Sequence, residues 1–202
     1  MSLRDATTTP DVYEAIKPKK DCKIEILNAE MGKPWKHKCQ VPAEGYKVPG
    51  ETRVMKLTIN ITDEAVETEN SDAKPRRKLD DMVILEQHPY VGKDDGAVHF
   101  LKLEKLFQLQ AYLGFEPKFV DASGNEVEAH ISKTGKKYCP KGASIAFRPE
   151  FLDAYFDANE EPRFDAWMNL EGVASIGVKK QTEEQAAQFG SGNEVKSYAP
   201  KA

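Results

Sequence analysis

Apolar and polar residues alternate along two stretches of the first third of the chain. In 22–26 the apolar residues share one face, and in 53–62 every second residue from Met55 to Ile61 is apolar. A period of two is typical of a half-buried strand. We therefore expect strands over both stretches. Shorter or less regular patterns predict further strands at 36–41, 78–87, 115–120, 126–131, 172–180 and 195–198.

The stretch 78–87 has a less regular pattern than the other strands. We expect Leu79, Met82 and Ile84 to face the core because they are its large apolar residues. Asp80 and Asp81 are adjacent carboxylates, and we expect both to be solvated, as charged residues usually are.

Two stretches show helical spacing instead. Apolar residues recur every three or four positions within 100–113, and Gly114 follows as a natural helix end. A second helix is predicted over 148–158, with Pro149 in its first turn. We interpret its aromatic residues, together with Trp167, as core or as a surface that faces a partner protein.

The order of these elements predicts a mainly β or α+β fold. A five-stranded OB-like barrel, with a helix between its third and fourth strands, fits this order. We expect a flexible N-terminal arm at 1–18, a single domain at 19–198 and a tail at 199–202. Residues 116–165 exceed what such a core requires, so they are expected to form an irregular and helical insertion or extension.

Composition narrows the class of protein. The 202 residues carry a formal net charge of −4, and 31% of them are charged. No apolar run approaches the roughly 18 residues that a membrane helix needs, and the N-terminus lacks a signal-peptide pattern, so we expect a cytoplasmic protein without membrane contact. Cys22, Cys39 and Cys139 are an odd set with no framework spacing, which disfavours disulfides.

Sequence motifs of catalysis are missing. The chain has no phosphate-binding glycine loop, no HExxH, no GxSxG and no CxxC. We therefore expect a non-catalytic protein without a cofactor or metal. A metal role for His37, Cys39 and Cys139 stays open at this stage, although zinc usually requires four ligands in close pairs.

The distribution of charge is more informative than its sum. Three windows are basic and free of acids, namely 33–38, 74–78 and 131–148, and two of them contain interleaved aromatic residues. Proteins that bind single strands combine cations for phosphates with aromatic faces for bases. We expect the three windows to meet on one face. The predicted stacking residues are Trp35, Tyr46, Tyr90 and Tyr138. The predicted phosphate contacts are Lys36, Lys38, Arg53, Lys56, Arg76, Arg77, Lys78, Lys133, Lys136 and Lys137.

Five segments follow one another in a recognisable layout: Pro42-Ala43-Glu44-Gly45-Tyr46, the alternating 55–61, Arg76-Arg77-Lys78, the helical 106–114, and 193–198. This layout resembles phage-encoded single-stranded-DNA-binding proteins of OB-like fold. The resemblance implies a role in DNA replication, recombination or repair in the host cytoplasm, with replication or recombination proteins as partners. A preference between DNA and RNA and the oligomeric state, including a homo-oligomer, stay open.

Two other functions compete with this prediction. The first is a protein–protein interaction module, or a virion or accessory protein without affinity for nucleic acid. The apolar residues of 148–158 and the acids around them would then dock a partner. The second is an enzyme whose site is assembled from residues distant in sequence.

Overall fold

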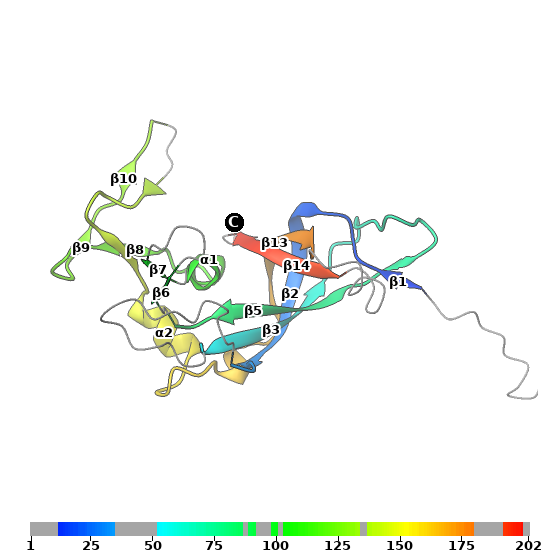
Figure 1. The fold of residues 1–202 in the computed structure, drawn as a ribbon, viewed down its shortest axis with the longest axis horizontal. Coiled ribbons are helices and arrows are strands. Elements are labelled where there is room, and N and C mark those ends of the chain that lie inside the picture. Colours follow the sequence, from blue (N-terminus) through cyan, green and yellow to red (C-terminus); the bar gives the residue numbers. More distant parts are fainter. Residues whose placement is uncertain are drawn as a thin grey trace, which may run out of the picture.

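The main sheet of the protein has five strands. The structure, a computed structural model, describes residues 12–34, 52–86, 89–91, 98–100, 103–133, 137–179 and 192–199, with backbone alone for 89–91, 98–100 and 137–138. Every neighbouring pair of strands is antiparallel, in the order β14-β13-β2-β3-β5 (Figure 1). The strands are β2 (Lys19–Met31), β3 (Val54–Ile61), β5 (Lys78–Ile84), β13 (Leu170–Val178) and β14 (Asn193–Ala199).

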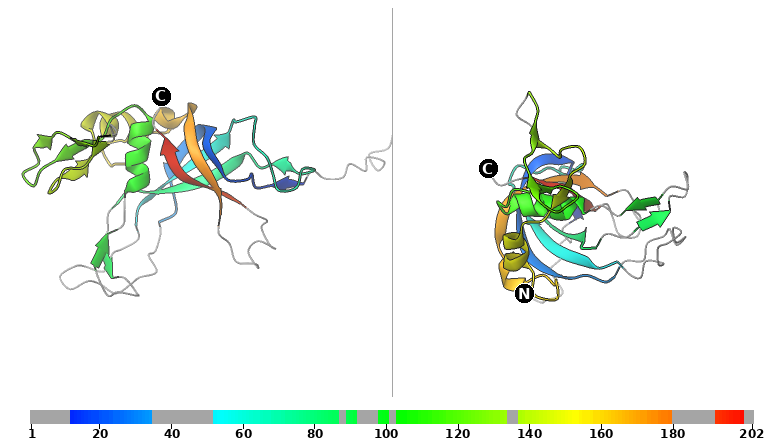
Figure 2. Two further views of the ribbon diagram at one scale, coloured as in Figure 1. Left: turned by 90° about the horizontal axis from the view of Figure 1, so that it is seen from above. Right: turned by 90° about the vertical axis from the view of Figure 1, so that its left-hand side faces the viewer.

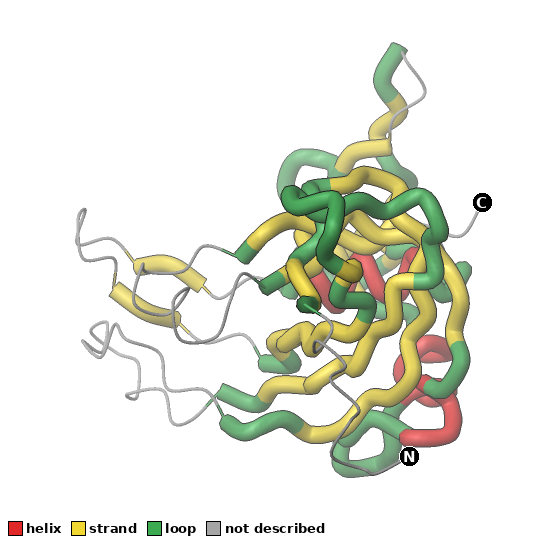
Figure 3. The backbone as a smooth tube through the Cα atoms, turned by 90° about the vertical axis from the view of Figure 1, so that its right-hand side faces the viewer, coloured by secondary structure: helices red, strands yellow, loops and turns green. Residues whose placement is uncertain are grey.

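The sheet curls around β2, a long strand whose two neighbours pair with different parts of it. Its first half pairs with β13 and its second half with β3, and a bulge lies between Ile26 and Asn28. Bulges bend a strand and increase its twist. Figure 3 shows the curl of the strands. The curl brings the two edge strands, β14 and β5, towards each other (Figure 2).

Helix α1 (Glu104–Tyr112) lies between the edge strands at this closure. The backbone N–H of Tyr198 in β14 donates to Gln108 Oε1 of α1 at 3.0 Å. The result is a partly open barrel with a helix between its third and fourth strands, which confirms the OB-like prediction.

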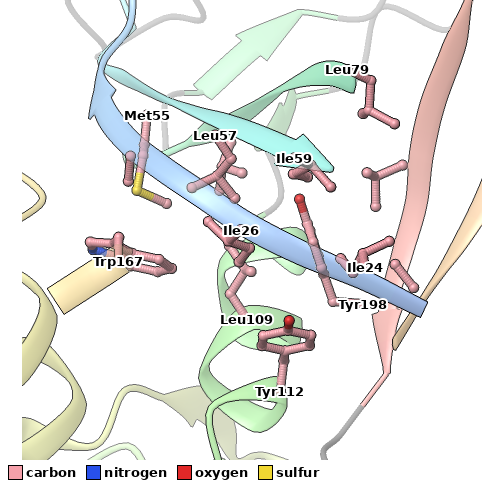
Figure 4. Close-up of a cluster of buried hydrophobic side chains, with 14 of the residues drawn as sticks. Ile24, Ile26, Met55, Leu57, Ile59, Leu79, Leu109, Tyr112, Trp167 and Tyr198 are labelled. Carbon is pink, nitrogen blue, oxygen red and sulfur yellow. The ribbon is translucent and has the colours of Figure 1, made fainter. Parts of the chain in front are cut away.

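The core fills the inside of the barrel. Met55, Leu57, Ile59 and Ile61 of β3 are fully buried, as their alternation predicts. They meet the inward side chains of β2 and the α1 residues Leu109 and Tyr112 (Figure 4).

Strand β5 faces the core with a different set of residues from the expected one. Its register pairs Leu57 with Asp81 across the sheet, so Leu79, Asp81 and Val83 point inward. Met82 is 44% exposed on the outer face, and Ile84 is half-buried. The expectation that Met82 faces the core and that Asp81 is solvated was wrong, because the cross-strand register sets the inward face.

The segment before β2 is packed against the barrel rather than free. Strand β1 (Tyr13–Glu14) pairs in parallel with β4 (Lys74–Pro75), and Ile16 is fully buried. Asn193 holds this segment, since its Oδ1 accepts from Ile16 N at 2.9 Å and its Nδ2 donates to Ile16 O at 3.0 Å. The expected arm therefore does not reach residue 18, while residues 1–11 lie outside the described part.

Beyond α1 the chain builds an extension at one end of the barrel (Figure 1). Gly114, at φ 89°, ends the helix as predicted. The extension contains β8 (Lys118–Val120), β9 (Glu126–Val127) and β12 (Ser144–Ala146) in one sheet, and the hairpin of β10 (His130–Ile131) and β11 (Lys137–Tyr138). A further pair, β6 (Pro89–Val91) and β7 (Val98–Phe100), precedes α1, so the helix begins later than the expected residue 100.

The second predicted helix is α2 (Pro149–Tyr155), followed by the 3-10 helix η1 (Phe164–Trp167). Phe151, Phe156 and Trp167 are buried, which confirms that the aromatic residues here form core. In the described part of the chain, no helix has the length and apolar character that crossing a bilayer requires.

Candidate nucleic-acid interface

The outer face of β3 and β5 carries the polar half of the alternating pattern. Lys56, Thr58 and Asn60 point outward from β3, and Lys78 and Met82 do so from β5. The register places Lys56 opposite Met82 and Asn60 opposite Lys78. The sequence pattern predicted Lys56 and Lys78 as site residues, but not Thr58, Asn60 or Met82. Thr58 and Asn60 could have been found, because they follow Lys56 at every second position and so lie on the same face of the strand.

Lys56 lies between two carboxylates on this face. Its Nζ is 3.1 Å from Glu30 Oε1 and 3.4 Å from Asp80 Oδ2. The hydrogen bond to Glu30, followed by the charge of Asp80, raises the pKa of Lys56. Exposed ion pairs of this kind contribute little to stability, so a phosphate can replace a carboxylate as the partner of this lysine.

Arg53 makes its contacts with the protein itself. Its guanidinium donates to Asn159 O at 2.9 Å and to Glu160 Oε2 at 3.4 Å, and its Nε lies 3.6 Å from Glu86. Arg53 therefore ties the loop after α2 to the start of β3. A phosphate would have to displace these contacts to bind this residue.

The window 74–78 is divided between packing and solvent. Arg77 Nη1 donates to Ile61 O at 3.0 Å and to Asp63 O at 2.8 Å, so this arginine holds the loop that follows β3. Arg76 reaches the carbonyl of Tyr13 at 3.5 Å. Lys78 is exposed at the start of β5, on the outer face described above.

The window 131–148 lies far from the window 74–78. Lys133 is exposed shortly after β10, and β10 lies towards one end of the long axis of the molecule. β1, which pairs with β4, lies at the other end (Figure 1). The structure does not bring these two windows to one face, because the hairpin grows from the extension beyond α1.

The remaining predicted residues fall where side chains are not described. Trp35, Lys36, Lys38, Tyr46 and Lys136 lie outside the described residues, as does the strand expected at 36–41. For Tyr90 in β6, and for Lys137 and Tyr138 in β11, the backbone alone is described. By sequence, Trp35, Lys36, Lys38 and Tyr46 belong to the connection between β2 and β3.

Of the three residues considered for a metal role, the structure describes only one. His37 and Cys39 lie outside the described residues, and Cys139 is exposed in the extension. Among the described residues, no three His, Cys, Asp or Glu side chains are grouped so that they could hold a metal ion. Cys22 is buried in β2, and burial raises the pKa of its thiol.

A buried carboxylate joins the elements behind the outer face. Asp81 is 5% exposed, and it accepts hydrogen bonds from Lys105 Nζ at 2.5 Å and from Tyr198 Oη at 2.8 Å. These contacts connect β5 with α1 and β14. Buried charges need such partners. The sequence did contain a sign that Asp81 is buried. Asp81 lies midway between Leu79 and Val83, so in a strand the three side chains point to the same face.

Asp81 predicts a specific dependence of stability on pH. Burial raises the pKa of its carboxyl and outweighs Lys105 and Tyr198, which both lower it. A carboxyl with a raised folded pKa stabilises the fold fully below its unfolded pKa of about 3.9, and loses this contribution as pH rises through the folded value. We therefore expect the free energy of unfolding of the wild type, minus that of Asp81→Asn, to fall as pH rises through the acidic range.

Urea unfolding of both proteins between about pH 3 and pH 7 measures this difference. The other carboxyl groups are common to both proteins, so their contributions cancel. A difference that rises with pH would show that the Lys105 and Tyr198 contacts outweigh burial.

The geometry thus offers a mixed polar and apolar face on β3 and β5, and in the sequence the Trp35 window belongs to the connection that joins β2 to β3. No family model matches this chain, and no curated protein or solved structure matches it either.

Proposed function

We propose that this protein binds single-stranded DNA, without catalysing a reaction, on the outer face of β3 and β5 and on the connection between β2 and β3. The strand order carries the proposal. In OB barrels, the second and third strands and the loops that follow the first and fourth strands bind oligonucleotides. Here β3 and β5 hold the second and third places, and the connection after β2 contains the window 33–38.

The chemistry of the face supports this proposal. Lys56 and Lys78 supply cations, Thr58 and Asn60 supply hydrogen-bonding groups, and Met82 supplies apolar contact for a base. Glu30 and Asp80 compete with phosphate for Lys56, so the face by itself would bind weakly. Most of the affinity is therefore assigned to the cations and aromatic residues of the β2–β3 connection.

Single strands are exposed during replication, recombination and repair, and we place the protein in these processes. The resemblance of its sequence layout to phage-encoded single-stranded-DNA-binding proteins supports this role. A labelled oligothymidine, titrated with the protein and followed by fluorescence anisotropy, tests the proposal. We expect binding at low salt, with log K falling linearly against log salt by about 0.7 for each phosphate neutralised. Absence of binding at low salt would refute the proposal, and a matched oligouridine decides between DNA and RNA.

Trp35 is expected to contribute strongly to this binding. Stacking of one base on an aromatic side chain is worth about 1–3 kcal/mol, so Trp35→Ala should weaken binding roughly 5- to 150-fold. The chain has two tryptophans, and the other, Trp167, is fully buried, with its indole N–H donating to Tyr155 O. Quenching of tryptophan fluorescence by an oligonucleotide therefore reports on Trp35.

Trp35→Phe is the matched control for this measurement. It keeps a ring for stacking, so it should retain most of the affinity while the quenching disappears. Quenching that persists in Trp35→Phe would place the contact elsewhere. Full affinity in Trp35→Ala would remove Trp35 from the interface.

A further inference from the structure

The outer face of β3 and β5 carries exposed hydrogen-bond acceptors as well as cations. Glu30 of β2 and Asp80 of β5 flank Lys56, and their side chains are 52% and 55% exposed. The cross-strand register places Asp80 opposite Thr58, in the row next to Lys56 and Met82. Phosphates avoid exposed carboxylates because like charges repel. A bound single strand would therefore turn hydrogen-bond donors, rather than phosphates, towards these two acids.

Asp80 is held in place by two residues of β3. Its Oδ1 accepts a hydrogen bond from Thr58 Oγ1 at 3.2 Å, and its Oδ2 lies 3.4 Å from Lys56 Nζ. An ionised carboxylate has about four lone-pair sites and no donor. The two contacts leave lone pairs on both oxygens, and the exposed side chain presents them to solvent. Asp80 can therefore accept further hydrogen bonds from a ligand, but it can donate none.

Met82 and Lys56 supply the other two contacts that a nucleotide beside Asp80 requires. Met82 follows Asp80 by two residues on the same face of β5, so the two lie about 7 Å apart along the strand. The side chain of Met82 is exposed, and thioethers pack favourably against aromatic rings. A base that lies on Met82 can direct its edge towards Asp80, while its phosphate replaces that carboxylate as the partner of Lys56.

The four bases differ in what their edges offer to a carboxylate. Cytosine presents the N4 amino group and adenine the N6 amino group, and both groups donate hydrogen bonds. Thymine presents O4 in the corresponding place, and this oxygen can only accept. An oxygen that faces Asp80 would form no hydrogen bond and would be repelled by the negative charge. The outer face therefore favours bases that carry an exocyclic amino group.

We propose that Asp80 reads the base, so that the protein binds cytosine- and adenine-rich single strands more tightly than thymine-rich ones. Asp80 accepts a hydrogen bond from the exocyclic amino group, and Met82 supports the ring of the base. Thr58 is a positioning residue, because it acts on the base only through the carboxylate of Asp80. The preference rests on the proposed function, since it assigns a class of base to the same face.

Two pyrimidine oligonucleotides of equal length, oligodeoxycytidine and oligodeoxythymidine, test the preference. They share one backbone, so fluorescence anisotropy at neutral pH and a single salt concentration compares the base contacts alone. We expect oligodeoxycytidine to bind at least about fivefold more tightly, the lower end of what a specific base contact contributes. Equal affinity, or tighter binding of oligodeoxythymidine, would overturn the preference and leave the proposed function standing. Absence of binding to both would refute the preference together with the proposed function.

Asp80→Asn and Asp153→Asn separate base reading from net charge. Each removes one negative charge, and Asp153 is an exposed residue of α2, outside the outer face of β3 and β5. Asp80→Asn should bind the two oligonucleotides equally, because its amide can donate to thymine O4 as well as accept from cytosine N4. Asp153→Asn should keep the ratio of the wild type. A ratio that survives Asp80→Asn, or that Asp153→Asn also abolishes, would overturn the role of Asp80.

The positioning role of Thr58 has its own pair of variants. Thr58→Val removes the hydroxyl that donates to Asp80 Oδ1, so the ratio of the two affinities should fall towards one. Thr58→Ser keeps the hydroxyl and should restore the ratio of the wild type. A ratio that is equal in the two variants would contradict positioning through this hydrogen bond.

Discussion

Trp167→Ala is expected to lower the free energy of unfolding by about 3–5 kcal/mol, the usual cost of truncating a buried tryptophan. The total stability of a domain is only about 5–15 kcal/mol, so the variant would sit near the limit of folding. Trp167 has this effect because it joins the extension to the barrel. It belongs to η1, which packs against β2, and it is fully buried.

The contacts of the Trp167 ring explain the size of the effect. Its centroid lies 5.0 Å from that of Tyr155, 5.9 Å from that of Phe156 and 6.5 Å from that of Phe151, all in edge-to-face geometry. Its indole N–H donates to Tyr155 O at 2.9 Å. Removal of the ring leaves a cavity among rigid aromatic side chains that cannot collapse easily.

Urea unfolding, followed by circular dichroism, measures this loss. Phe164→Ala is the matched control, because Phe164 lies in the same 3-10 helix but is 55% exposed. Its substitution should change the stability by less than about 0.5 kcal/mol. Equal losses for the two variants would contradict the central place of Trp167 in the core.

Gly172→Ala is expected to be the second most damaging change, at about 1–3 kcal/mol or more. A Cβ on Gly172 would overlap Cε2 and Cζ of Tyr112. The ring of Tyr112 cannot easily move, since it is 1% exposed and its hydroxyl donates to Leu170 O at 2.9 Å. The new methyl group must therefore separate α1 from β13.

A double-mutant cycle tests this explanation. Tyr112→Leu removes the ring that the methyl group would strike, so Gly172→Ala should cost much less in that background. The coupling between neighbouring sites of this kind is typically 0.5–3 kcal/mol. Additive losses, measured by urea unfolding of the four proteins, would show that the close approach of Tyr112 is not the cause.

Local patterns in the sequence were sufficient for the elements of the barrel. The alternation in β3 predicted its buried face correctly, because every inward position there is a large apolar residue. The spacing before Gly114 and the proline before Phe151 predicted α1 and α2. The order of these elements then led to the OB-like barrel, since few topologies accommodate strands that are neighbours in sequence around a single helix.

Local patterns were not sufficient for the candidate site. A run of cations shows that charge is present, but not where the fold carries it. The structure places Lys78 on the outer face of the barrel and commits Arg77 to the loop after β3. It puts β10, which Lys133 follows, at the opposite end of the molecule from β1, the partner of β4. These outcomes depend on contacts between residues that are distant in sequence.

The sequence by itself therefore determined which segments form the five strands and the helix of the barrel, and that the faces of these elements differ in polarity. Only the tertiary structure decided which face of β5 is buried. Asp81 turns inward because Tyr198, 117 residues away, and Lys105 satisfy its carboxylate. A period of two separates the two faces of a strand, but a charge can occupy the buried face only when the fold brings its partners to it.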